Sequence, residues 1–428
     1  MNLSMDWLKQ LAEALLQLLL NPLYYIGLLL ILLQYRRQMA LERKLFHVKL
    51  HGMLGETWRA VLSGWLAGIA ASLVMAVIGA RLQPETVLLL WGITAVLMLV
   101  RARLACLAYA VGALGLLQGL YELIPSLRDI NGMGWLKTAV VEADMPSLFA
   151  LVAVLHLLEG MLVRWQGQRL SSPLFFEGKR GKLIGGYHLH GFWPVPLFLL
   201  IPAPGGLTLP WTPFFYGDAA AAGWTLMAMP ALIGFTERTV AFLPKHKTER
   251  TSGRLYIYGT IILLLAVASE YVPLLVPVAA ILGIVLHEAL IWVSRREESN
   301  HRPLFVHERN GLKILAVLPN SPAAVMGLEP GETIYKVNGE KVQTKEQLHQ
   351  AMRLSSAFCR LEVVNGAGQN KFVSRALYAG DHHQLGLILC PDSDARYYVG
   401  EKQRELTVAA FFLSRWKGLR KNDQTESM

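Results

Sequence analysis

Several histidines and carboxylates lie inside long apolar stretches, where ionisable side chains are rare. They form three close pairs: His156 with Glu159, Glu237 with Arg238, and His287 with Glu288. An ionisable group is costly inside a bilayer, so such residues often serve transport or catalysis. They can also face the interior of a helix bundle, pair with one another and fix the packing. We favour this structural role, because no internal repeat or pair of broken helices typical of transporters is evident.

These residues can be compared directly with the sequence motif of an intramembrane protease. An intramembrane zinc protease needs His-Glu-x-x-His on a helix, with two histidines on the metal and the glutamate as base. His287-Glu288 begins this pattern, but Ile291 stands where the second histidine should be. No soluble segment could hold a trypsin-like domain with its nucleophile loop, and nucleotide-binding glycine patterns are missing. We therefore expect no catalytic residues and a protein that is not an enzyme. A cryptic or inactive membrane protease, or a transporter using the intramembrane His and Glu residues, is the alternative.

The cysteines give no sign of a cofactor. Cys106, Cys359 and Cys390 are far apart and form no Cys-x-x-Cys pair. Neither a disulfide framework nor a zinc site is indicated, and we expect no metal and no cofactor. We also find no cleavable signal peptide, because the first residues lack a basic segment and no small-residue cleavage site follows the first apolar stretch.

The elements that carry these residues are membrane spans. Of the 428 residues, 53% are hydrophobic and 17% charged, against about a quarter charged in a soluble protein. The mean hydropathy is +0.36. Spans of about 17–25 apolar residues are predicted near 60–80, 86–100, 103–121, 147–163, 189–203, 224–243, 255–272 and 274–293. Residues 3–20 form a further apolar helix that ends at Asn21-Pro22, with a second apolar piece up to Leu33. This N-terminal region is one kinked span, or an interfacial helix followed by a short insertion.

The charges of the loops predict the orientation. Loops 34–59, 101–103, 164–182, 245–254 and 295–302 hold twenty Lys and Arg residues, whereas the alternate loops hold three. By the positive-inside rule, the basic loops and everything after 295 are cytoplasmic. The net charge of +10 therefore faces lipid headgroups, and we expect no nucleic-acid partner.

After Arg296 the sequence changes to short strand-like runs separated by turns. Strands are predicted at 311–318, 333–337, 360–364, 371–377 and 385–389. Helices are predicted at 323–327 and 344–355, and Asn338-Gly339 is a strong hairpin turn. Residues Ser321 to Val342, SPAAVMGLEPGETIYKVNGEKV, resemble the SPAxxAGLxxGDxIxxVNG stretch of bacterial PDZ domains. The expected fold is therefore an α-helical polytopic membrane domain followed by a small α/β PDZ domain. The latter is a five- to six-stranded, partly open β-barrel with two helices.

This resemblance implies a peptide-binding groove. A PDZ domain binds an extended peptide as an added strand beside a helix and holds a terminal carboxylate in backbone amides. The groove helix would be 344–355, with Leu348 and Met352 toward the peptide. The carboxylate loop would be Gln384-Leu385-Gly386-Leu387, at the C-terminal end as in a circular permutation. Gln384 replaces the family's first glycine, so an internal segment or a folded partner is an equal alternative to a free carboxylate. A domain that only packs on its own membrane part is a further alternative.

Sequence features outside this domain indicate a particular family among membrane proteins with a PDZ domain. They are Asn21-Pro22-Leu23-Tyr24-Tyr25, Gln34-Tyr35-Arg36-Arg37-Gln38, Leu41-Glu42-Arg43-Lys44-Leu45-Phe46-His47, and His287-Glu288 before Arg295-Arg296. With a multi-span N-terminal region and no catalytic domain, the chain resembles the MinJ family of cell-division topological determinants. The resemblance implies a membrane-anchored scaffold, enriched at septum and poles, that bridges a DivIVA-like and a MinD-like protein. The bilayer and a second copy in a homo-oligomer are further expected partners.

These observations divide the chain into four regions. They are an N-terminal apolar helix or first span (1–33), a polytopic domain of about eight spans (34–295), a cytoplasmic PDZ domain (301–392) and a C-terminal tail (393–428). In the tail, residues 401–421 predict a basic amphipathic helix. This helix lies on the inner leaflet, covers the groove or contacts a partner.

Overall fold

The computed structural model describes residues 3–46, 52–124, 134–178, 181–216, 223–307, 311–355, 357–376, 378 and 385–392. The predicted tail, 393–428, and Gln384 lie outside these residues. The membrane half contains helices α1 (Leu3–Leu20), α2 (Pro22–Phe46), α3 (Met53–Ile78), α4 (Pro84–Val100), η1 (Ala102–Ala105), α5 (Leu107–Leu123), α6 (Gly134–Val141), α7 (Met145–Gln166), α8 (Pro244–Tyr271) and α9 (Leu275–Asn300). It also holds strands β1 (Ser171–Glu177), β2 (Leu183–Leu207) and β3 (Trp224–Thr239) with the short helix η4 (Phe214–Tyr216).

Four of these helices, α3, α7, α8 and α9, are long and apolar enough to cross a membrane. They match the spans predicted at 60–80, 147–163, 255–272 and 274–293. Helices α1 and α2 count as a fifth candidate if they form one span, with a bend of 57° between them. Pro22 begins α2 directly after Asn21, because proline is accepted in a first helical turn but not in a helix interior.

The predicted helical spans at 189–203 and 224–243 are wrong, because these residues lie mainly in β2 and β3. The two strands pair antiparallel along nearly their whole length, and β1 adds to the other edge of β2. An apolar run cannot be assigned to helix or strand by hydrophobicity alone. Pro194, Pro196 and Pro202 could have decided the matter, since prolines at such spacing break a helix.

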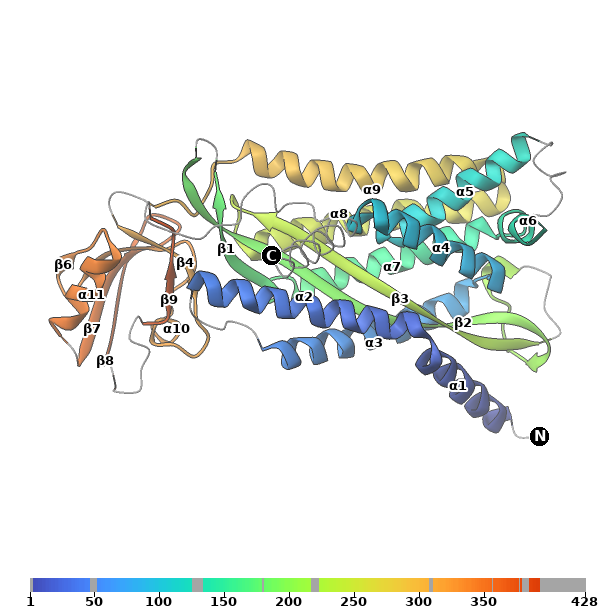
Figure 1. The fold of residues 1–428 in the computed structure, drawn as a ribbon, viewed down its shortest axis with the longest axis horizontal. Coiled ribbons are helices and arrows are strands. Elements are labelled where there is room, and N and C mark those ends of the chain that lie inside the picture. The colour runs from blue at the N-terminus through green and yellow to red at the C-terminus, as the bar shows by residue number, and fades with distance from the viewer. Residues whose placement is uncertain are drawn as a thin grey trace, which may run out of the picture.

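Small residues let this long hairpin pack closely against the helices. Gly64 and Gly68, one turn apart on α3, face the carbonyl oxygens of Pro194 and Pro196, with which any Cβ would collide. The hydroxyl of Ser72, a further turn along, accepts a hydrogen bond from the backbone N–H of Phe198 at 2.8 Å. Figure 1 shows β2 and β3 running obliquely through the helical part for most of its length.

Helices α4 and α5 are shorter, with 17 residues each, and η1 joins them. Arg103 in η1 reaches the carboxylate of Glu288, near the middle of α9, at 3.3 Å. The tip of this helical hairpin therefore lies beside the interior of α9. Our interpretation of Arg103 as part of a basic loop beyond the spans is corrected accordingly.

The C-terminal domain is a small sheet with two helices. It contains strands β4 (Leu312–Val317), β5 (Thr333–Val337), β6 (Glu340–Lys341), β7 (Phe358–Val364), β8 (Asn370–Ala376) and β9 (Leu387–Leu389), and helices α10 (Pro322–Val325) and α11 (Lys345–Arg353). The strand order is β8-β7-β5-β4-β9, with β6 paired to β5. The sheet is open, as expected for a partly open barrel, and this domain lies at one end of the molecule (Figure 1).

Candidate peptide-binding groove and its anchorage to the membrane domain

The Ser-Pro-Ala-Ala turn positions the predicted carboxylate loop. The Ser321 hydroxyl donates to the carbonyl of Leu318 at 2.7 Å and accepts from the amide of Ala324 at 3.3 Å, capping α10. The amide of Ala323 then donates to the carbonyl of Leu385 at 2.9 Å. The motif thus holds the loop before β9 by backbone hydrogen bonds, although more than sixty residues separate the two segments in sequence.

The loop itself has an unusual backbone. Leu385 and Gly386 both have positive φ, +58° and +74°, and Leu385 is completely buried. A positive φ is uncommon for leucine and costs about 1–3 kcal/mol unless the surroundings enforce it. Gly386 has no alternative, because a Cβ there would collide with the side chain of Ser321. Such strain at a loop that begins an edge strand is typical of a functional site.

Among the described residues, strand β9 is the edge of the sheet beside this loop. The carbonyl of Gly386 accepts from Leu318 and the amide of Cys390 donates to Lys313, so both residues turn their backbone groups toward β4. Because successive residues of a strand alternate in direction, the backbone groups of Leu387 and Leu389 face the outer edge. That is the edge to which an added strand would bind.

Helix α11 is held next to this sheet by two local devices. Thr344 and Gln347 form a capping box at its first turn. At its other end, the Asn338 amide group donates to the carbonyl of Ala351 at 3.0 Å, and its oxygen accepts from the amide of Arg360 at 2.8 Å. The asparagine of the Val-Asn-Gly motif thereby ties the helix to β5 and β7.

The structure brings most of the predicted groove residues together. Leu348, Leu385 and Leu387 belong to one buried cluster, and Met352 packs against it while half-buried. Leu348 and Leu385 are too deeply buried to touch a ligand directly, and they belong to the core of the domain. Among the described residues predicted to form the groove, Met352 is partly exposed, whereas Leu385, Gly386 and Leu387 are buried. Burial in the same core raises the pKa of the Cys359 thiol to about 11.

The other face of β9 and β4 packs on the membrane domain. Ile388 and Cys390 belong to the same buried cluster as Leu315, Tyr187 and Phe305, on the opposite face from Leu387 and Leu389. The Tyr187 hydroxyl donates to the carbonyl of Leu315, and its ring packs edge-on against Phe305. The groove strand is therefore fixed to the end of the long β-hairpin.

Glycine makes this contact possible. A Cβ at Gly185 would lie 2.9 Å from the Leu315 side chain and 3.0 Å from that of Phe305. The amide of Gly185 donates to the carbonyl of Phe305 at 2.8 Å, and that of Leu304 donates to Val240 at 2.8 Å. The segment after α9 is thus bound by backbone hydrogen bonds to β2 and to the end of β3.

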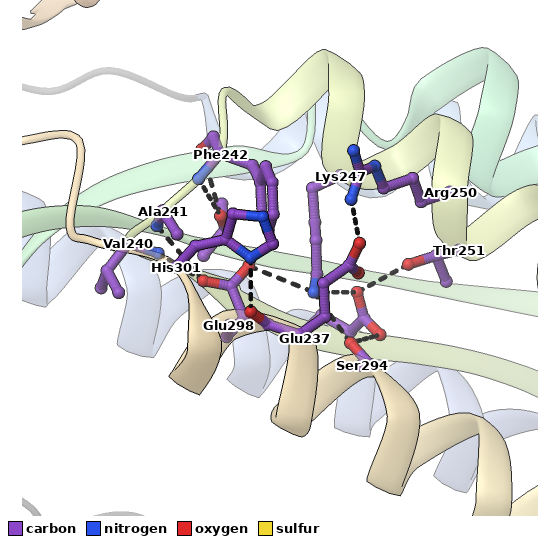
Figure 2. Close-up of polar contacts among 12 residues, drawn as sticks. Glu237, Val240, Ala241, Phe242, Lys247, Arg250, Thr251, Ser294, Glu298 and His301 are labelled. Atoms are coloured by element: carbon purple, nitrogen blue, oxygen red, sulfur yellow. Dashed lines mark hydrogen bonds and ion pairs between the residues drawn. The ribbon is translucent and has the colours of Figure 1, made fainter.

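A buried lysine anchors the same junction from the helical side (Figure 2). Lys247, with no exposed surface, lies 2.8 Å from the Ser294 hydroxyl, 3.2 Å from Glu298 and 3.7 Å from Glu237. Glu298 also accepts from the amides of Val240 and Ala241, at 3.1 and 3.2 Å. This network, which we call the Lys247 cluster, joins the end of β3, the start of α8 and the end of α9.

Sequence reasoning found one member of this cluster and missed its role. It identified Glu237 as an ionisable residue within a predicted span, paired with its neighbour Arg238. The structure pairs Glu237 with Lys247, Thr251 and Ser294 instead, at the end of a strand. Tyr187, Phe305 and Gly185 carried no sequence signal, because their importance depends on contacts between segments more than a hundred residues apart.

Fold and site together define a polytopic membrane protein with a C-terminal PDZ domain. The family model for a PDZ domain matches residues 313–364, which confirms the sequence-based expectation. Among known proteins, the chain is similar to the cell division topological determinant MinJ of Bacillus subtilis (strain 168). The two are 27% identical over 397 residues, which cover 91% of this chain and 97% of that protein.

Other relatives agree with this similarity. A probable MinJ determinant of Lacticaseibacillus paracasei is 26% identical over 364 residues, covering 83% of this chain and 91% of the relative. A probable MinJ of Lacticaseibacillus casei (strain BD-II) matches with the same identity and coverage. The likeness extends over the membrane half as well as the PDZ domain. The MinJ-like character inferred from the sequence is therefore confirmed.

Proposed function

We propose that this protein is a membrane-anchored scaffold whose cytoplasmic PDZ domain recruits and positions cell-division proteins. The observation that carries the proposal is the edge strand β9, whose outer backbone groups lie beside a strained, tightly held loop. Edge strands of this kind bind partners by strand addition. The similarity to division determinants supports a role in placing the division site rather than catalysis.

The finer proposal is a bridge between a DivIVA-like and a MinD-like protein at septum and poles. Anchorage of the groove supports it, because a scaffold must hold its binding surface at a fixed place relative to the membrane. Tyr187 and the Lys247 cluster provide such an anchor. A flexibly tethered PDZ domain could recruit a partner to the membrane but could not hold it at a fixed position.

The distribution of charge supports a cytoplasmic PDZ domain. Basic residues lie at or just beyond the ends of the helices near the PDZ domain. Arg169, after α7, contacts Glu56 at the start of α3, and Arg250 and Arg254 on α8 contact Glu297 near the end of α9. Basic loops face the cytoplasm. A cysteine introduced at exposed Gln343 should therefore react with an impermeant maleimide only after the cells are opened. Labelling of intact cells would place the domain outside.

The groove itself is tested by a charge on its accessible wall. Met352→Lys places an ammonium at the half-buried wall of α11, whereas Gln350→Lys adds the same charge at an exposed position of that helix. Fluorescent fusions of both variants should reach the membrane. Only Met352→Lys should lose septal and polar enrichment and produce filaments or minicells like a deletion. Normal localisation and cell length for Met352→Lys would show that partners bind elsewhere.

A further inference from the structure

A second cluster of reactive side chains lies far from the groove, inside the helical bundle. Cys106 follows η1, His156 lies near the middle of α7, and His287 lies within α9. The Cys106 sulfur and one ring nitrogen of each histidine all lie within 4.8 Å of one another. The three residues are separated by 50 and 131 positions, so no sequence spacing could have indicated their meeting.

The hydrogen bonds of both imidazoles leave a lone pair available. The Nδ1 atom of His156 lies 2.7 Å from the carbonyl of Val152, which can only accept, so Nδ1 carries the proton. In the neutral ring, Nε2 is then unprotonated, and it lies 3.4 Å from the Cys106 sulfur. Histidines that bind metals commonly donate their other N–H to a carbonyl or carboxylate in this manner.

The second histidine, His287, is oriented by two consecutive hydrogen bonds through Tyr109, which we call the relay. The Tyr109 hydroxyl donates its only proton to Glu288 at 2.8 Å, so its oxygen accepts from Nδ1 of His287 at 3.0 Å. The remaining nitrogen of His287 is therefore also unprotonated in the neutral ring. Tyr258, almost fully buried, packs edge-on against both imidazoles and limits their movement.

These three groups match the ligands of a soft metal ion. Ligand atoms that share one tetrahedral ion lie about 3.3–3.7 Å apart. The distance between Cys106 and His156 is already within this range, and the other pairs need to close by about 1.5 Å at most. A thiolate with two imidazoles selects Cu⁺ or Zn²⁺ over Mg²⁺ or Ca²⁺, which prefer oxygen ligands.

We propose that Cys106, His156 and His287 bind one soft d-block cation, Cu⁺ or Zn²⁺, within the helical bundle. The ion thereby links the α4–α5 hairpin to α7 and α9. The Lys247 cluster does not reach this hairpin, because its residues come from the end of β3, the start of α8 and the end of α9. The two ions differ in the charge they require: the Cys106 thiolate alone neutralises Cu⁺, whereas Zn²⁺ needs a second negative charge, which Glu159, close enough to interact with Cys106, can supply. An uncompensated charge is costly in an apolar interior.

The test uses the full chain purified in detergent and loaded with either Zn²⁺ or Cu⁺ under ascorbate, followed by metal analysis after gel filtration. We expect about one ion per chain in the wild type, and a more than tenfold loss in Cys106→Ser, His156→Phe and His287→Phe. Cys359→Ser, which removes a buried thiol in the PDZ domain, should retain the ion. The metal that the wild type retains shows whether the site binds Cu⁺ or Zn²⁺.

A spectroscopic measurement distinguishes the loss of a metal ligand from the loss of folding in the variants. Co²⁺ added to the wild type should give a thiolate-to-cobalt charge-transfer band, absent in Cys106→Ser that elutes as the same monodisperse peak. Tyr109→Phe, which leaves the ligands in place but removes the relay, should weaken binding about 10–100-fold. Wild-type protein that retains neither Zn²⁺ nor Cu⁺ above the level of Cys106→Ser would overturn the proposal.

Discussion

Replacement of Lys247 by methionine should destabilise the junction between the membrane and PDZ domains. Methionine keeps most of the side-chain volume but removes the ammonium that lies between Ser294, Glu298 and Glu237. Two carboxylates then share a site without a buried cation. Breaking a buried ion pair by removing one partner costs about 3–5 kcal/mol. Even about 3 kcal/mol raises the population of a locally opened junction more than a hundredfold.

Limited proteolysis of the full chain in detergent measures this opening. Arg295 and Arg296 lie on the last turns of α9, next to the cluster, and trypsin can cut there only when the helix end unfolds. When opening is rapid relative to cleavage, the rate follows the open population. We therefore expect cleavage at this site to accelerate by about two orders of magnitude in Lys247→Met.

Lys245→Met is the matched control, because Lys245 is exposed two residues earlier on the same helix. Its cleavage rate should equal that of the wild type, since an exposed lysine contributes about 0–1 kcal/mol. A second substitution, Glu298→Gln, should recover part of the loss by removing one uncompensated charge. Equal cleavage rates for Lys247→Met and Lys245→Met would refute the structural role of the cluster.

Four further outcomes follow from individual contacts. Gly386→Ala should destabilise the PDZ domain by about 1–3 kcal/mol in thermal unfolding, whereas Gly366→Ala, which meets no neighbouring atom, should have little effect. Asn338→Ala removes two side-chain hydrogen bonds and should cost about 2 kcal/mol, seen as faster amide exchange in α11 while β8 is unchanged. The Cys359 thiol, with a raised pKa of about 11, should react with iodoacetamide far more slowly at pH 8 than a free cysteine, and denaturant should restore the normal rate. Tyr187→Phe leaves the Leu315 carbonyl without its donor and should speed trypsin cleavage between the domains severalfold; an unchanged rate would argue against fixed docking.

The C-terminal domain was largely predictable because its information is local. The Ser-Pro-Ala-Ala turn, the Asn338-Gly339 hairpin and the amphipathic 344–355 segment each specify their own conformation, and the structure has all three. The loop at Leu385 was found from a short pattern. Its attachment to Ser321 and the burial of both faces of β9 were not, because they depend on contacts with distant segments.

In the membrane half the apolar segments and four of the long helices were predicted correctly, but strands β2 and β3 were not. Hydrophobicity predicts that a segment avoids water, and both a helix and a paired strand satisfy that condition. Residues 183–207 form a strand because Gly64 and Gly68 on α3 provide space for it and β3 satisfies its backbone groups. Neither condition is visible within the strand's own sequence, where only Pro194, Pro196 and Pro202 argue against a helix. The Cys106 cluster was hidden for the same reason.

The proposed orientation does not depend on the assignment that proved wrong. Two predicted helical spans would start and end on the same side of the membrane. The β-hairpin that replaces them also starts and ends on one side, so the predicted side of every later loop is unchanged. The start of β2 at Leu183 and the end of β3 at Thr239 lie near the PDZ domain, and the paired ends at Leu207 and Trp224 lie at the opposite end of the hairpin (Figure 1). The positive-inside argument counts loops rather than helices. It would therefore apply to a strand pair as it does to a helix pair if the hairpin, which is paired from Tyr187–Pro202 to Trp224–Thr239, crosses the membrane.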